Sequence, residues 1–194
     1  MSEVREPVKK TSKKTKQRII EKGFELICKE GYHNITCADI AKYAGVSTGS
    51  IYQYFSNKKD ILINGINQYL TEIMFPKIIT QEKLSKEQLI KELINASIES
   101  HKKYKIQHEE LVSIVHQDKE LSKLYQEKEW EMTKYLTKYL EAYNIDPDNL
   151  LEKTHIILGL IDNLSHEIIY HKHKELKEEN LKKETEQLIL KILT

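Results

Sequence analysis

Hydrophobic positions repeat with a helical period from about residue 12 onward. In the first such segment Ile20, Phe24 and Ile27 are spaced i, i+4 and i+7, and lysines occupy the other side. Gly31 ends this helix, because glycine adopts the left-handed conformation easily. No segment shows the sustained alternation of apolar and polar residues that a half-buried strand needs. The pattern therefore predicts an all-α chain.

Two short helices follow the first one. Thr36 is a suitable N-cap, with Asp39 three residues later, for a helix that stops at Gly45. Ser47 caps a third helix that runs through Tyr54. Six longer segments complete a prediction of about nine helices, with a turn at 146–149: about 57–75, 86–104, 108–117, 119–143, 149–172 and 175–193.

Composition excludes several classes of protein. The chain of 194 residues has 6 glycines and 3 prolines, so few segments are interrupted by turns. Its two cysteines cannot form a disulfide framework or a four-cysteine zinc site, and we expect reduced thiols. The N-terminus lacks the apolar stretch of a signal peptide, and no run of about 18 apolar residues could span a membrane. We expect a cytoplasmic protein with no membrane partner.

The near-zero net charge of +1 conceals two unlike regions. Residues 1–60 contain 12 Lys and Arg against 7 Asp and Glu, whereas residues 61–194 contain 19 against 23. A basic end on an acidic body suits binding to a polyanion at that end only. Residues 1–11 are predicted to be a disordered basic arm, for which a solubilising tail is an equally open interpretation.

The third short helix has an outward side suited to contacting DNA. Ile51 and Phe55 share one side and would pack on the first two helices, which leaves a small, polar outward face. Gly49 would let the backbone approach a phosphate closely, and Gln53 could pair with an adenine edge. We expect DNA contacts from Thr36, Cys37, Ser47, Thr48, Gly49, Ser50, Tyr52, Gln53, Tyr54 and Lys58.

Residues 18–62 resemble the DNA-binding domain of the TetR (tetracycline-repressor-like) family. The matching motifs are Gly31-Tyr32, Ile40-Ala41, Ala44-Gly45-Val46-Ser47, Gly49-x-Ile51-Tyr52 and Tyr54-Phe55, together with Thr36 and Lys58. Cys37 departs from the family pattern, in which many members carry a hydroxyl or β-branched residue. The resemblance implies a helix-turn-helix domain over 12–58, with its motif at about 36–55, and a ligand-binding and dimerisation domain over 59–194.

The same resemblance implies that the last two helices form a homodimer interface. The segment 155–161 is apolar around nearly its whole circumference, which is expected only where several sides are buried. These helices could instead merely close the core of the monomer. The expected interface residues are Ile157, Leu160, Ile161, Leu164, Leu188 and Ile192.

The resemblance also implies an effector pocket among the middle helices. Aromatic residues at helical spacing are more often core filler, so each member of this set is open to that interpretation. The expected lining residues are Tyr69, His101, Tyr104, His108, Leu111, Tyr125 and Trp130. The spacings of His166, His171 and His173 put no pair on one helix face, so we expect surface histidines and no metal or other cofactor.

No sequence motif for catalysis is present, so no enzyme is expected. The chain is expected to be a transcriptional repressor that a small-molecule effector releases from a pseudo-palindromic, double-stranded operator. The alternative is an architectural or division-linked DNA binder with the same DNA-binding domain and no effector.

Overall fold

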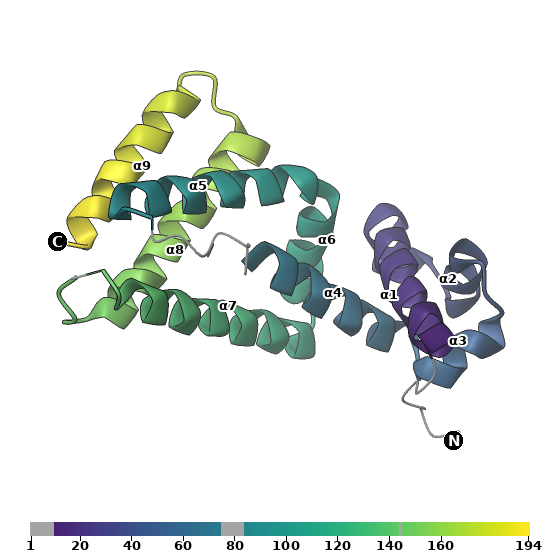
Figure 1. The fold of residues 1–194 in the computed structure, drawn as a ribbon. Coiled ribbons are helices and arrows are strands. Elements are labelled where there is room, and N and C mark those ends of the chain that lie inside the picture. Colours follow the sequence, from purple (N-terminus) through teal and green to yellow (C-terminus); the bar gives the residue numbers. More distant parts are fainter. Residues whose placement is uncertain (1–9, 75–83, 144) are drawn as a thin grey trace. The chain divides into compact units, whose positions relative to one another are not determined.

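The computed structural model describes residues 10–74, 84–143 and 145–194 (Figure 1), and within them every regular element is a helix. The predicted arm at 1–11 falls mostly outside these residues, but its last two residues, Lys10 and Thr11, belong to the first helix. The elements in chain order are α1 (Lys10–Glu30), η1 (Tyr32–Asn34), α2 (Cys37–Ala44), α3 (Thr48–Tyr54), α4 (Lys58–Met74), α5 (Lys86–Lys103), α6 (Lys105–Val115), α7 (Lys119–Leu140), α8 (Leu150–His166), η2 (Glu167–His171) and α9 (Glu178–Ile192).

The predicted all-α class is confirmed, and the α-helices follow the predicted segments closely. Two elements were not predicted: η1 is a single 3₁₀ turn, and η2 continues α8 as a π-helix. A 3.6-residue apolar pattern does not distinguish such a turn from ordinary α-helix, since the side chains stay on much the same face. None of the described helices is long and apolar enough to cross a membrane.

The chain forms two compact units. Unit 1 is the part up to Leu70 together with Ile106–Leu124, and unit 2 is Thr71–Lys105 together with Tyr125–Thr194. Unit 1 includes α6 because Glu110 accepts a hydrogen bond from the backbone N–H of Tyr32 and Asp118 pairs with Lys59. The sequence predicts a boundary between two functional domains at residues 58 and 59. The two compact units divide the chain at other positions, so that functional boundary stays a prediction.

The core of unit 1 forms where α1 crosses α2 and α4. Ile19, Ile27, Ile40 and Ile61 are fully buried in it. The helices approach so closely that a Cβ added at Gly23 would lie 2.6 Å from Cγ2 of Ile61. The core therefore holds α2 and α3 against α1 through tightly matched surfaces, and this fixes which face of α3 is left exposed.

Unit 2 has a separate core, in which α5, α8 and α9 contact one another (Figure 1). Leu89, Ile157 and Ile189 come from these three helices and are each at most 2% exposed. Leu136 and Leu140 of α7 join the same cluster. The last two helices thus contribute to a core within one subunit. Whether they also form a dimer interface stays a prediction.

Candidate nucleic-acid interface

Helix α2 begins with a complete capping box. The Thr36 side chain accepts a hydrogen bond from the backbone N–H of Asp39, and the Asp39 carboxylate accepts one from the backbone N–H of Thr36 at 2.9 Å. The Thr36 hydroxyl also donates to that carboxylate at 2.6 Å. These hydrogen bonds, the one from the Thr36 hydroxyl foremost, lower the pKa of Asp39 from its usual value. The Thr36 hydroxyl is therefore engaged in capping, a role that a phosphate contact would have to displace.

A sharp turn connects α2 to α3. Gly45 has φ 64° and ψ 43°, the left-handed conformation, and its N–H donates to the carbonyls of Ala41 and Lys42. Two residues later the Ser47 side chain accepts from the backbone N–H of Ser50 and so caps α3. The Ser47 and Ser50 hydroxyl oxygens lie 2.8 Å apart. The turn predicted from Gly45 and Ser47 is present, with the N-terminus of α3 exposed.

The two faces of α3 separate as predicted. Ile51 is fully buried and Phe55 is 2% exposed, so this side anchors the helix in the core of unit 1. On the opposite side Tyr52 is 48% exposed, and Gln53 is exposed beside it. Of the remaining predicted contact residues in and before α3, Ser47, Thr48 and Gly49 are exposed, and Ser50 and Tyr54 are half-buried. The outward face is continuous and polar, with hydroxyls and an amide available to a ligand.

Cys37 and Tyr52 come together across α2 and α3. The pKa of Tyr52 is raised from its usual value, and a charge on Cys37 is the first cause. Sequence spacing does not indicate this proximity, because the periodicity within each helix carries no signal for a contact between two helices.

Lys58 is anchored inside unit 1. Its Nζ donates to the carbonyl oxygens of Tyr32 and Ile35, at 2.6 and 2.8 Å, and lies 4.4 Å from the centre of the Tyr32 ring. The side chain is therefore half-buried against the loop that precedes α2. The sequence predicts that Lys58 contacts a phosphate. In the structure its ammonium group already donates to two carbonyl oxygens, so a phosphate would have to share the ammonium group with them.

The seven predicted pocket residues are distributed over the two units. In unit 1, Leu111 is 2% exposed and Tyr69 lies with its hydroxyl 3.2 Å from Nδ1 of His108. In unit 2, His101 is 6% exposed, and Tyr104 and Tyr125 are half-buried. Trp130 is 46% exposed on α7, because its position on the helix faces away from the core. The pocket therefore stays a prediction, and the exposure of Trp130 gives it no support.

Three of the predicted interface residues are buried within one subunit. Ile157, Ile161 and Leu164 are at most 4% exposed within a single subunit, because α8 packs this face on α5. They have no free surface to offer a second copy of the chain. Of the other three, Leu188 is 46% exposed, and Leu160 and Ile192 are half-buried. The exposed apolar residue on α8 is Ile156, at 55%, which the sequence analysis did not select.

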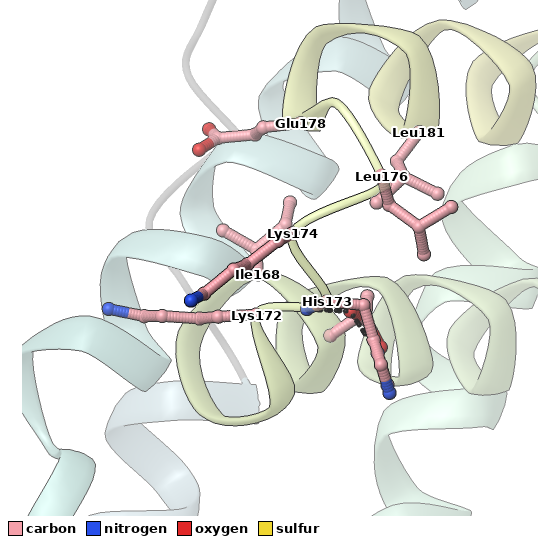
Figure 2. Close-up of a pocket in the computed structure, with 8 residues that line it drawn as sticks. Ile168, Lys172, His173, Lys174, Leu176, Glu178 and Leu181 are labelled. Atoms are coloured by element: carbon pink, nitrogen blue, oxygen red, sulfur yellow. Dashed lines mark hydrogen bonds and ion pairs between the residues drawn. The ribbon is translucent and has the colours of Figure 1, made fainter.

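A hollow of about 370 Å³ lies at the corner where η2 leads into α9 (Figure 2). Ile168, Leu176 and Leu181 form its apolar part, and Lys172, His173 and Lys174 lie along the connection. None of the predicted pocket residues lines it. This hollow is therefore a different feature from the predicted effector pocket.

Part of the first unit of this chain is similar to known proteins. Residues 19–64 match the family model described as bacterial regulatory proteins, tetR family. The fatty acid metabolism regulator protein of Bacillus subtilis (strain 168) is 51% identical over 47 residues, which is 24% of each of the two chains. A helix-turn-helix transcriptional regulator of Staphylococcus aureus (strain MRSA252) is 26% identical over 73% of this chain and 74% of its own.

A solved structure covers nearly the whole chain. The fatty acid degradation regulator FadR of Bacillus halodurans has a TM-score of 0.66 and 25% identity, over 91% of this chain and 94% of its own. The family-model match at residues 19–64 contains α3 and its polar face.

Proposed function

We propose that this chain, which matches the TetR family over residues 19–64, is a homodimeric transcriptional repressor that binds a pseudo-palindromic operator and is released by a small-molecule effector. The observation that carries this proposal is the division of α3 into a buried face at Ile51 and Phe55 and an exposed polar face at Tyr52 and Gln53. A helix held in this way can enter the major groove without losing its support.

The N-terminus of α3 supports a close approach to DNA. A Cβ built on Gly49 would meet only the Ser47 hydroxyl, at 3.8 Å, so the protein itself does not require glycine there. Glycine at position 49 would instead be required where a partner surface such as DNA approaches the backbone closely. Exposed hydroxyls and N–H groups at a helix N-terminus suit a phosphate.

Dimerisation would use the exposed faces of α8 and α9. Ile156 on α8 and Leu188 on α9 are large apolar residues at the surface, and Gly159 has nothing within 4 Å of an added Cβ. A second copy could therefore approach α8 closely at Gly159. A twofold dimer presents two recognition helices about one DNA turn, ~34 Å, apart, which predicts an operator with matching half-sites.

Acyl compounds are the first effector class to test. Two similar proteins carry names that refer to fatty acid metabolism or degradation, one similar over 47 residues and the other over most of the chain. An effector that prefers one state of the dimer would weaken operator binding by a coupling free energy of about 1 to 3 kcal/mol.

The deciding experiment is selection of bound sequences from a random DNA library by the full-length protein. The proposal expects an inverted repeat, tight binding of that repeat by fluorescence anisotropy, and loss of binding in Tyr52→Ala and Gln53→Ala. Far-ultraviolet circular dichroism checks that both variants fold. Selection of no sequence, or equal binding by folded Tyr52→Ala and wild type, would refute the assignment of α3.

The same assay separates the repressor from the architectural alternative. Acyl compounds that raise the melting temperature and reduce operator affinity support an effector-released repressor. DNA binding with little sequence preference, unchanged by any compound that stabilises the protein, supports the architectural DNA binder.

A further inference from the structure

A cluster of two histidines and an aspartate lies within unit 2, where α5 packs on α8. His101 comes from α5, and Asp162 and His166 come from α8. One carboxylate oxygen of Asp162 lies 3.3 Å from Nε2 of His101, and the other lies 3.7 Å from Nε2 of His166. The ligand atoms of the two histidines lie within 4.8 Å of each other. The two oxygens of the Asp162 carboxylate thus each face a different histidine, on two helices that share one core.

Two members of the cluster are neighbours because of their spacing on α8. Asp162 and His166 are separated by four residues, which places both on one face of a helix. The π-helix η2 begins directly after His166, and a π-helical turn in an α-helix frequently marks a functional site. The rings of His101 and His166 meet edge to face, with centroids 5.2 Å apart. Sequence spacing gave no sign of this cluster, since its third member comes from α5.

The hydrogen bonding of His101 orients the ring for ligation. Its Nδ1 lies 2.8 Å from the carbonyl oxygen of Ser97, which can only accept, so Nδ1 carries the proton. In the neutral ring Nε2 then presents its lone pair on the side of Asp162. Metal-binding histidines almost always donate their other N–H to a carbonyl or carboxylate, which fixes the tautomer. The ring is 6% exposed and is held in place by the surrounding core.

We propose that His101, Asp162 and His166 bind a divalent transition-metal ion of the zinc class. Two imidazole nitrogens and one carboxylate oxygen form a donor set typical of zinc sites that keep a fourth position open. The Asp162 side chain is 51% exposed, so water or a ligand group could reach a metal ion from that side. The metal would join α5 to α8, two helices of the core. The proposal does not rest on DNA binding.

A second set of similar residues provides a matched control. His171 and His173 both pair with Glu167, and their side chains are 55% and 61% exposed. The rings lie 6.0 Å apart at the surface near the hollow of Figure 2. This set also has two histidines and one carboxylate, here a glutamate, but it has no buried ring, and all its members lie on one short segment of chain. Binding there would be the ordinary weak affinity of surface histidines.

The test is titration of the full-length, metal-free protein, prepared without a histidine tag, with Co²⁺. We expect one Co²⁺ per chain with the visible d–d absorption of a tetrahedral site, and its displacement by Zn²⁺, which binds such donors more tightly. Asp162→Asn and His166→Gln should each weaken binding at least tenfold. His171→Gln and His173→Gln should leave the affinity and the spectrum unchanged. Because His101 is buried, Asp162→Asn, at an exposed side chain, is the variant that separates lost ligation from lost folding.

Two results would overturn the proposal. One is the absence of the tetrahedral Co²⁺ spectrum in the folded wild-type protein. The other is binding that persists in Asp162→Asn and His166→Gln but is lost in His171→Gln or His173→Gln. Operator binding is measured on the same samples, so the loss of one property without the other distinguishes this site from the proposed function.

Discussion

The Nζ of Lys58 donates a hydrogen bond to the carbonyl oxygen of Tyr32, 2.6 Å away, and so ties the start of α4 to the turn before α2. A second hydrogen bond reaches the carbonyl of Ile35, and the ammonium lies over the Tyr32 ring. The side chain that sequence analysis assigned to a phosphate therefore also supports the position of α2. The two roles predict different consequences for a substitution.

We expect Lys58→Ala to destabilise the protein as well as weaken operator binding. Loss of a charged donor leaves two partly buried carbonyls without it, and such hydrogen bonds contribute about 1.5 to 3 kcal/mol. Urea unfolding measures the loss. Lys29→Ala is the control, because Lys29 is an exposed lysine paired only with Glu30, and its removal should change stability by less than about 1 kcal/mol. Equal stability of Lys58→Ala and wild type would contradict the anchoring role.

Two glycines near α3 should respond in opposite ways to alanine. Gly49→Ala meets no obstacle in the protein, so the fold should tolerate it, but the added methyl group should separate α3 from DNA and reduce operator affinity about tenfold. Gly45→Ala should instead destabilise the protein by about 1 to 2 kcal/mol, because φ is 64° there. Thermal unfolding and fluorescence anisotropy on the same samples distinguish the two effects. Full operator affinity in Gly49→Ala would argue against a close approach at this position.

Local signals predicted the helices and the turn of the DNA-binding domain well. Thr36, Gly45 and Ser47 each determine a helix end by their own chemistry, and the structure contains the capping box, the left-handed turn and the N-cap that they imply. The buried face of α3 followed from the four-residue spacing of Ile51 and Phe55. Such features depend on residues near each other in sequence, where periodicity and capping are informative.

Features that join distant elements were not predictable in this way. Lys58 finds its carbonyl partners 26 and 23 residues earlier in the chain. The apolar circumference of residues 155–161 indicated burial on several sides but not which side faces the subunit's own core. As a result, Ile157 was assigned to the interface although α5 covers it, while exposed Ile156 was overlooked. Tertiary packing decides such questions, and a single sequence does not record it.

The capping box of α2 predicts a dependence of stability on pH. Hydrogen bonds from Thr36 lower the pKa of Asp39 in the folded protein, so its contribution to stability is present above the unfolded pKa of about 4. That contribution is lost as the pH falls through the lower, folded value. Asp39→Asn should therefore lower the free energy of unfolding at neutral pH. In acid the difference in free energy of unfolding between this variant and the wild type should become smaller. Urea titrations at both pH values measure this, and a constant gap would show that the Asp39 charge does not stabilise α2.

The exposed apolar residues of α8 and α9 predict which substitutions break a dimer. Ile156→Glu and Leu188→Glu each place a charge on a surface that is 55% or 46% exposed in one subunit, so the subunit should still fold. In a dimer the same charge would be buried, and dissociation should become at least about 30-fold easier, since central interface residues contribute about 2 kcal/mol or more. Ile106→Glu is the control, because Ile106 is 58% exposed on α6, outside the last two helices. Sedimentation velocity gives the mass of each variant. A dimer that survives both α8 and α9 substitutions but dissociates with Ile106→Glu would move the interface away from the last two helices.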